Sequence, residues 1–160
     1  MRIVFDLDGT LSDPTHRLHY IKGERKDWDS FFRESYKDEP IHVTLHILQD
    51  LHAQGHSISI WSGRSKGDLN EVRNGTLGWL EKQNIAVRGE FQRNCFITID
   101  ALLMREHGDH RPDVQLKLEW LAASRTLGCL PDLVFEDRGR MVVAWREAGI
   151  PCFQVADGAF

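Results

Sequence analysis

The 160-residue sequence has few cysteines and no long hydrophobic run. Its three cysteines, Cys95, Cys129 and Cys152, are too few and too scattered for a disulfide framework or a CxxC zinc site. Free thiols are typical of proteins in the reducing cytoplasm. No apolar run approaches the ~20 residues that span a bilayer, and acidic residues interrupt the first apolar run too early for a secretory signal. We therefore expect a cytoplasmic protein with no membrane anchor.

An excess of positive charge is lacking as well. Lysine and arginine total 20 and aspartate and glutamate total 24, so the formal net charge is −4. No overall basic field would attract nucleic acid, and a polyanionic ligand would have to be bound by local arginines. Internal repeats and low-complexity tracts are absent, and the composition is that of a soluble globular protein. We expect one domain over residues 1–160 with one sizeable core.

Short apolar stretches alternate with helical patterns along the chain. Strands are expected at Arg2–Phe5, Ser57–Trp61, Leu133–Phe135 and Cys152–Val155, with Ala101–Met104 as a fifth candidate. Helical periodicity covers Ile41–Gln54, Asp68–Gln83, a segment that starts at Pro112, and Gly139–Ala148. This alternation predicts an α/β fold, a Rossmann-like three-layer sandwich with a mainly parallel sheet. The segment Asn84–Ile99 has no clear period.

The strongest chemical signal is Asp6-Leu7-Asp8-Gly9-Thr10, directly after the first expected strand. Ligands bind beyond the carboxyl ends of parallel strands, and residues i and i+2 point the same way, so both carboxylates should reach one pocket. Their mutual repulsion would be relieved by a divalent cation, and Gly9 permits a tight turn. These residue types suit covalent phosphoryl transfer, in which one carboxylate attacks phosphorus and the other protonates the leaving oxygen. The alternative is a solvated acidic turn.

Polar residues also follow other expected strands. Ser62 and Arg64 follow the second strand, and Glu136 and Asp137 follow the strand that ends at Phe135. With D-x-D-G-T after the first strand, this order resembles the motifs of the haloacid dehalogenase superfamily. The resemblance implies that Ser62 hydrogen-bonds a phosphoryl oxygen and that Lys117 neutralises phosphate and nucleophile.

The same resemblance implies a cofactor and a mechanism. Mg²⁺ would be held by the Asp6 carboxylate, the Asp8 backbone carbonyl and Asp137, with Glu136 beside these ligands. Asp6 would attack phosphorus to form an aspartyl-phosphate. Asp8 would donate a proton to the leaving group and then activate water. The expected protein is a magnesium-dependent phosphatase.

A narrower resemblance is to the phosphatase domain of the T-even bacteriophage polynucleotide kinase-phosphatases, over most of the chain. It is carried by Arg17, Ser62-Gly63-Arg64, Arg105, Gly108-Asp109, Asp113, Lys117, the acid pair with Arg138, and the tail Cys152–Phe160. It implies that Arg17, Arg64, Arg105 and Asp113 bind phosphate or order the site. Asp113, four residues before Lys117, would hold that lysine extended. The implied substrate is a 3′-phosphate on a nucleic-acid end or a nucleotide.

The sequence departs from that family in three respects. Glu136 stands where the family has Asp, the segment Asn84–Ile99 is longer, and no G-x-x-x-x-G-K-[ST] motif is present. We therefore expect no kinase domain in this chain. Because the sequence ends at Phe160 as the family does, we expect a complete phosphatase unit.

The insert between the first strand and the first long helix is short. Residues 12–40 are enough for two short helices but not for a full cap domain, so the site should stay open to bulky substrates. The aromatic residues Trp28, Phe31 and Phe32 are more typical of packing within this insert than of stacking on nucleobases, since aromatics mostly serve burial.

Other functions remain open on the sequence. The same motifs serve 5′-nucleotidases and small-metabolite phosphatases. A non-enzymatic receiver module also has clustered acids and a lysine, but there the lysine follows the phosphoacceptor at a later strand end, whereas Lys117 precedes Glu136 and Asp137. Two histidine pairs at i, i+4 lack a third zinc ligand nearby, so we expect exposed helix residues; they are His42/His46 and His52/His56.

Overall fold

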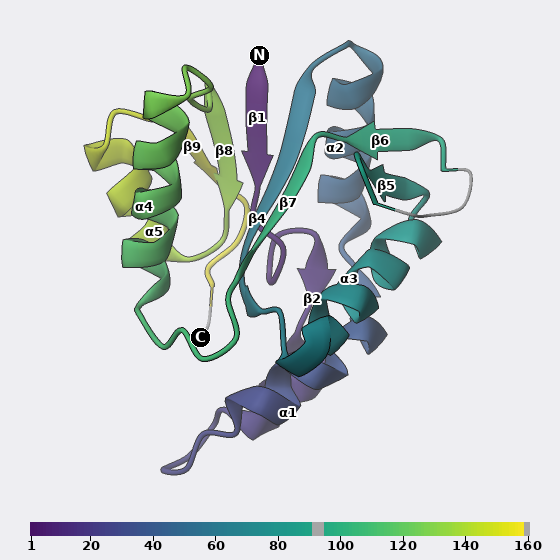
Figure 1. Cartoon of the computed structure of the whole chain (residues 1–160), viewed down its shortest axis with the longest axis vertical. Coiled ribbons are helices and arrows are strands. Elements are labelled where there is room, and N and C mark those ends of the chain that lie inside the picture. The colour runs from purple at the N-terminus through teal and green to yellow at the C-terminus, as the bar shows by residue number, and fades with distance from the viewer. Residues whose placement is uncertain (91–94, 159–160) are drawn as a thin grey trace.

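The computed structural model describes residues 1–90 and 95–158. At its centre lies a five-stranded sheet in the order β7-β4-β1-β8-β9, and all neighbouring strands are parallel (Figure 1). The strands are β1 (Arg2–Phe5), β4 (Ser57–Ser65), β7 (Ala101–Arg105), β8 (Leu133–Glu136) and β9 (Cys152–Gln154). The predicted α/β architecture with a mainly parallel sheet is confirmed.

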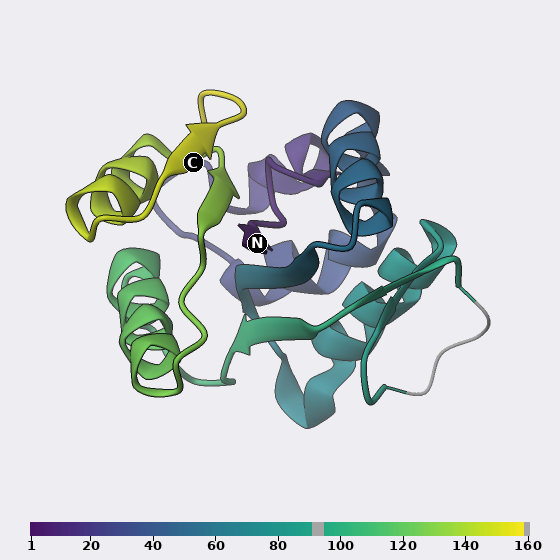
Figure 2. The same cartoon turned by 90° about the horizontal axis from the view of Figure 1, so that it is seen from above.

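Helices cover both faces of the sheet (Figure 2). They are α2 (His42–Ala53) and α3 (Glu71–Lys82) on one face, and α4 (Asp113–Thr126) and α5 (Gly139–Glu147) on the other. The alternation of side chains along β1 explains the three layers. Ile3 and Phe5 belong to the core beneath α2 and α3, whereas Val4 packs with Trp145 of α5.

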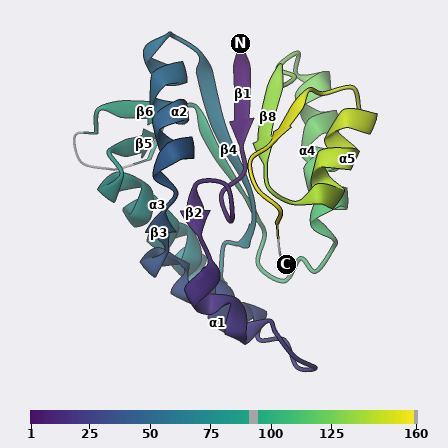
Figure 3. The ribbon, with the colours of Figure 1, turned by 180° about the vertical axis from the view of Figure 1, so that it is seen from behind.

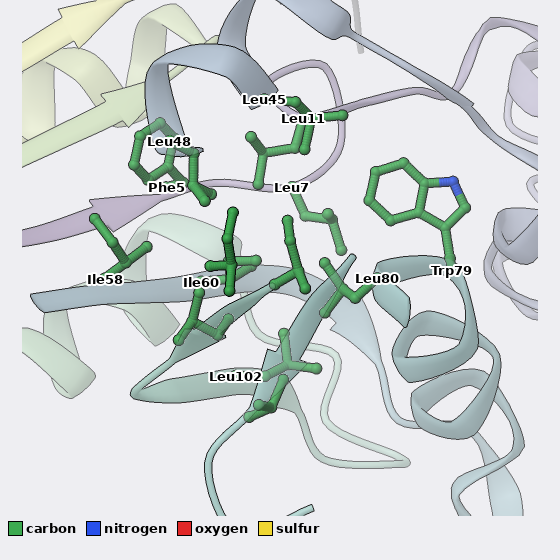
Figure 4. Packing of buried hydrophobic residues seen from close by; sticks show 14 of the residues in the cluster. Phe5, Leu7, Leu11, Leu45, Leu48, Ile58, Ile60, Trp79, Leu80 and Leu102 are labelled. Atoms are coloured by element: carbon green, nitrogen blue, oxygen red, sulfur yellow. The ribbon is translucent and has the colours of Figure 1, made fainter. Parts of the chain in front are cut away.

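The larger core holds the carboxyl edge of the sheet in place. Figure 4 shows Phe5 and Ile60 of the sheet against Leu48 of α2 and Leu80 of α3, and all four are fully buried. Burying one such side chain contributes roughly 1.5–3 kcal/mol. Because this packing continues to Leu7, the turn that follows β1 starts from a rigid position.

Residues 12–40 form a small insert at the carboxyl edge of the sheet (Figure 3). It contains one α-helix, α1 (Trp28–Arg33), the 3-10 helices Thr15–Tyr20 and Glu34–Lys37, and the antiparallel strands β2 (Ser12–Asp13) and β3 (Glu39–Pro40). The expected pair of short helices is therefore one α-helix and two 3-10 helices. These 29 residues cover part of the sheet edge and are not a large cap.

Two element boundaries differ from the prediction by more than one residue. The strand expected to end at Trp61 continues to Ser65, and its pairing with β7 slips between Ser62 and Ser65. The expected helix from Asp68 begins only at Glu71, because Leu69 (φ 50°) lies in the left-handed region and breaks the helical path.

The segment without a clear period contains two more strands. β5 (Ile85–Val87) and β6 (Ile97–Ile99) pair in parallel beside the main sheet. Their apolar side chains are buried in the core next to α3. Across the described part of the chain, no helix is both long and apolar enough to cross a membrane.

Candidate active site

The turn after β1 lies against the loop after β8. The Leu7 carbonyl accepts the N–H groups of Leu11 and Ser12 at 2.8 and 2.9 Å, which closes the turn. Gly9 has φ +83°, and a Cβ built there would lie 2.2 Å from Oδ2 of Asp137. Only glycine permits both this conformation and this approach. The glycine of the D-x-D-G-T segment therefore lets the loop after β8 close onto the loop after β1.

Lys117 links the first aspartate to the acidic pair. Its Nζ atom, on α4, donates to Oδ1 of Asp6 at 2.6 Å and to Oε2 of Glu136 at 2.8 Å. All three side chains are almost fully buried. Burial would lower the pKa of Lys117, but the charges of Asp6 and Glu136 outweigh burial and raise it, so the lysine stays charged.

A cluster of three carboxylates has too little positive charge around it. Oxygen atoms of Asp6, Glu136 and Asp137 lie within 4.8 Å of one another. Burial first, and then repulsion within the cluster, raises the pKa of Asp6 to about 7 and that of Asp137 to about 8. Oδ1 of Asp137 is buried and has no hydrogen-bond partner within the described ranges. This orphaned oxygen and the hard carboxylate donors fit a divalent cation such as Mg²⁺.

The segment after β9 supports Asp137 from behind. The backbone carbonyl of Asp137 accepts the N–H of Gly158 at 3.0 Å and Nε2 of Gln154, the last residue of β9, at 3.1 Å. A Cβ at Gly158 would lie 2.5 Å from Oδ2 of Asp137, so glycine is required there too. The last two residues of the tail whose resemblance was noted above, Ala159 and Phe160, lie outside the described residues.

Asp8 is turned away from this carboxylate cluster and toward two arginines. Its Oδ1 atom accepts Nη2 of Arg17 at 2.5 Å, and Nε and Nη2 of Arg64 at 2.8 and 2.5 Å. Burial would raise the pKa of Asp8, but the charges of Arg17 and Arg64 outweigh burial and bring the pKa below its ordinary value. Asp8 is therefore ionised in the free protein.

Asp38 completes this arrangement, and the sequence analysis missed it. The Asp38 carboxylate accepts Nε and Nη2 of Arg17 at 2.7 Å each, Nη2 of Arg64 at 2.7 Å and Oγ of Ser12 at 3.0 Å. Its backbone carbonyl accepts Nε1 of Trp79 at 2.7 Å, which ties the insert to α3. Two aspartates and two arginines thus form a buried quartet (Asp8, Asp38, Arg17 and Arg64) whose formal charges sum to zero.

The burial of Arg17 and Arg64 corrects the prediction that they contact phosphate directly. The side chains of Arg17 and Arg64 are 0% exposed, and the Phe31 ring lies 4.1 Å from Cζ of Arg17. The other predicted role, ordering the site, fits their contacts with Asp8. Arg64 reaches Asp8 because it lies in the irregular part of β4 between Ser62 and Ser65.

The remaining predicted residues lie in different positions around the site. Arg105 donates from Nε to the Gly63 carbonyl at 2.9 Å and from Nη1 to the carbonyls of Asp109 and Arg111 at 3.3 and 2.5 Å, so it orders the loop that follows β7. Ser62 is buried, and its Oγ accepts the N–H of Arg64 at 3.2 Å. Its contact with a phosphoryl oxygen stays a prediction.

The expected pairing of Asp113 with Lys117 is wrong. Oδ2 of Asp113 accepts Nη1 of Arg138 at 2.5 Å, and Oδ1 lies 3.2 Å from Nη2 of Arg140. Asp113 opens α4 at the edge of the site, whereas Lys117 lies one turn further in and bonds Asp6. Asp113 therefore positions Arg138 of the loop after β8 and Arg140 at the start of α5.

The histidine pairs do not add a second metal cluster within the described ranges. Three clustered acids, Asp6, Glu136 and Asp137, are the group found there that could hold an ion. His42 and His46 are exposed, as predicted, and His52 and His56 are half-buried.

A cavity of about 540 Å³ opens onto part of this site. Asp6, Asp8 and Lys117 border its inner end. Trp28 and Phe32 of α1 form part of one wall, and the loop from Arg105 to Asp113 forms another. A volume between roughly 300 and 1,000 Å³ is typical of sites for small molecules.

The fold and the site define a phosphatase of the haloacid dehalogenase superfamily. The family model described as the polynucleotide kinase PNKP phosphatase domain matches residues 1–160, and the chain belongs to this family.

Solved structures agree with this assignment. A chain in the structure of the Pnkp1/Rnl/Hen1 RNA repair complex is 28% identical, with a TM-score of 0.74, over 99% of this chain and 43% of that one. The chain thus spans less than half of the length of that relative. A class C acid phosphatase from Bacillus anthracis (14% identity, TM-score 0.60, 99% of this chain and 67% of that one) shares the fold. So does a D,D-heptose 1.7-bisphosphate phosphatase from B. bronchiseptica, solved with magnesium and phosphate (15% identity, TM-score 0.56, 96% and 79%).

Proposed function

We propose that this protein is a Mg²⁺-dependent phosphomonoesterase that removes 3′-phosphate from polynucleotide ends or nucleotides through an aspartyl-phosphate. Family membership and the RNA repair complex of a 28% identical relative support a nucleic-acid substrate. The observation that carries the chemistry is the position of Asp6, which borders the cavity with Lys117, accepts a hydrogen bond from that lysine and has an oxygen within 4.8 Å of one of Asp137. A cytoplasmic location, consistent with the three unpaired cysteines, belongs to the same proposal.

The metal site would be formed by the Asp6 carboxylate, the Asp8 backbone carbonyl and Asp137. When bound, Mg²⁺ would neutralise charge on the phosphoryl oxygens and relieve the repulsion within the carboxylate cluster. Glu136 is already paired with Lys117 at 2.8 Å, so it acts beside the ligands by orienting that lysine. Lys117 in turn holds Asp6 and compensates negative charge next to the phosphorus.

Asp6 would attack the phosphorus in line, forming a bond from a carboxylate oxygen as the bond to the leaving 3′-oxygen breaks. Asp8 would give its proton to that oxygen. A water molecule would then attack the aspartyl-phosphate, with Asp8 taking the water proton, to release inorganic phosphate and restore Asp6.

Asp8 must carry a proton for the first step, although it is ionised in the free protein. Arrival of a phosphate dianion raises the pKa of a nearby carboxyl by like-charge repulsion. The hydrogen bonds of Asp8 to the arginines all end on Oδ1, and Asp8 borders the cavity, so Oδ2 is the oxygen suited to carry the proton. The quartet would thus fix which oxygen faces the substrate.

A substrate panel tests this function. Oligonucleotides and mononucleotides with 3′- or 5′-phosphate, and small sugar phosphates, are incubated with the protein with and without Mg²⁺. We expect Mg²⁺-dependent release of phosphate, fastest from 3′-phosphate ends and abolished by Asp6→Asn but not by Asp50→Asn, an exposed acid on α2. Preference for 5′-phosphates or sugar phosphates would replace the proposed substrate, and no turnover of any member would remove the phosphatase assignment from this chain.

A further inference from the structure

Helix α1 presents two different aromatic faces. Phe31 is fully buried and covers the guanidinium of Arg17, so it belongs to the packing of the insert. Trp28 and Phe32, one turn apart, share another face and both border the cavity that contains Asp6. Their ring centroids are 5.8 Å apart with an interplanar angle of 27°, so they form a continuous aromatic surface.

Packing covers only part of Trp28, whose ring meets the Phe31 ring edge-on with the centroids 5.6 Å apart. The Trp28 side chain belongs to neither hydrophobic core cluster, and the residue remains 41% exposed. A large aromatic ring that stays partly in water loses the stabilisation that burial would give, and a ligand that covers it would restore this stabilisation. Aromatic side chains in such positions are typical of surfaces on which nucleobases stack.

Positive groups lie beside Trp28 and elsewhere on the same cavity. Lys26 Nζ lies 5.7 Å from the centroid of the Trp28 ring. Arg111 and Arg140 also border the cavity. Arg111 pairs with Asp109 and Glu119, and Arg140, whose side chain is 60% exposed, pairs with Asp113. A ligand with a flat ring and several phosphates would meet both kinds of surface. Aromatic rings with basic groups beside them are how single-stranded nucleic acid is bound without sequence preference.

We propose that Trp28 and Phe32 form a stacking subsite for the base of the 3′-terminal nucleotide whose phosphate reaches Asp6. This inference rests on the proposed function and adds a recognition element to it. Because every base has a π face, the subsite distinguishes a terminus with a base from one without, and it does not distinguish among the four bases. Asp6 and Trp28 both border the cavity of about 540 Å³, whose volume is typical of sites for small molecules.

The test compares two 3′-phosphorylated oligonucleotides that differ only at the last residue, which is either a normal nucleotide or an abasic sugar. We expect wild-type kcat/KM to be higher on the normal end. Trp28→Leu should lower kcat/KM on the normal end by roughly tenfold, within the range for one stacked base, and leave the abasic end unchanged. Trp28→Phe should keep most of the preference.

Tyr36→Leu provides the matched control. Tyr36 is an equally exposed aromatic residue of the insert (44%) that does not border the cavity, so its removal should leave both substrates unaffected. Equal wild-type kcat/KM on the two ends would overturn the subsite, and so would an equal loss on both ends in Trp28→Leu.

A binding measurement separates this inference from the proposed function. The Asp6→Asn protein is titrated with an oligonucleotide that ends in 2-aminopurine 3′-phosphate, whose fluorescence falls on stacking. We expect quenching that Trp28→Leu reduces and Tyr36→Leu does not. If the wild-type protein turned over no 3′-phosphate, the proposed function would fail, and this titration would still decide on the subsite: quenching that depends on Trp28 supports it, and its absence refutes it.

Discussion

Asp38→Asn should weaken both the fold and the chemistry, although Asp38 lies behind Asp8 and not in the cavity lining. The substitution keeps the size of the side chain and removes one negative charge from the buried quartet. Arg17 and Arg64 then face Asp8 alone, and one positive charge is uncompensated where both guanidinium groups are 0% exposed.

The loss of stability follows from that imbalance. Breaking a buried ion pair by removing one partner costs about 3–5 kcal/mol, and we expect about 3 kcal/mol because asparagine retains some of the hydrogen bonds. At about 2–4 °C per kcal/mol for a chain of this size, Tm should fall by about 6–12 °C. The matched control is Glu34→Gln in the same insert, which removes an exposed i,i+3 pair with Lys37 and should leave Tm unchanged.

The effect on activity should depend on the leaving group. Uncompensated guanidinium charge keeps Asp8 ionised, and proton donation by a positioned acid contributes about 10²–10⁴-fold to rate. We expect kcat for an alkyl phosphate, whose leaving oxygen needs a proton, to fall by roughly 10–100-fold. Para-nitrophenyl phosphate, whose leaving group needs none, should lose far less. Wild-type Tm and kcat in Asp38→Asn, or equal losses on the two substrates, would refute this reasoning.

Three further outcomes are expected. Burial and repulsion raise the pKa of Asp6 to about 7 and that of Asp137 to about 8, so the folded protein keeps protons that the unfolded chain releases near pH 4. The free energy of unfolding of the metal-free protein should therefore fall as the pH rises from about 4 to about 8. Thermal scans should then show a larger Mg²⁺-induced rise of Tm at about pH 9 than at about pH 6, and Asp137→Asn should remove this difference. Arg64→Lys keeps the charge but replaces the two guanidinium nitrogens that bind Asp8 by one amine, so kcat should fall at least about tenfold while circular dichroism shows a folded protein. Wild-type kinetics would show that the paired guanidinium nitrogens are not needed. Lys117→Met leaves Asp6 and Glu136 in unrelieved repulsion, so kcat on para-nitrophenyl phosphate should fall at least about 100-fold, and a smaller loss than in Arg64→Lys would show that the lysine is dispensable.

The sequence was sufficient for those parts of the site that follow from strand order. Parallel strands end at one edge, so Asp6, Asp8, Glu136 and Asp137 were expected together. The structure clusters Asp6, Glu136 and Asp137 at the ends of β1 and β8, whereas the Asp8 carboxylate faces Arg17 and Arg64. Lys117 was expected near them, and the i+4 spacing from Asp113 suggested a reason that the structure corrects. An i+4 spacing indicates that two side chains share a helix face, but not which other partners compete for each of them.

Long-range contacts account for the residues that were missed or misplaced. Asp38 reaches the site because the insert folds back over Ser12 and α3, and no spacing along the chain indicates this. Arg17 and Arg64 were expected to bind phosphate or order the site because the family resemblance implies these roles and a guanidinium group suits phosphate. Their burial depends on Asp38, so missing one residue led to the wrong position for two others.

The departure at position 136 has a structural explanation. Glu136 stands where the resembled family has Asp, and its longer side chain places Oε2 2.8 Å from Nζ of Lys117. The backbone at this position is fixed by β8, since the Glu136 carbonyl accepts the N–H of Val155 at 3.0 Å. The acid pair can therefore keep its function with the longer residue as the partner of the lysine.

The most direct test of the account is to trap the covalent intermediate. The protein is mixed with Mg²⁺ and a 3′-phosphate oligonucleotide whose terminal phosphate is radiolabelled, quenched in acid during turnover, and digested for peptide mapping. We expect label on the peptide that contains Asp6, sensitive to hydroxylamine as an acyl phosphate is, and absent in Asp6→Asn. Rapid turnover without any labelled protein, or label on a residue other than Asp6, would contradict the proposed mechanism.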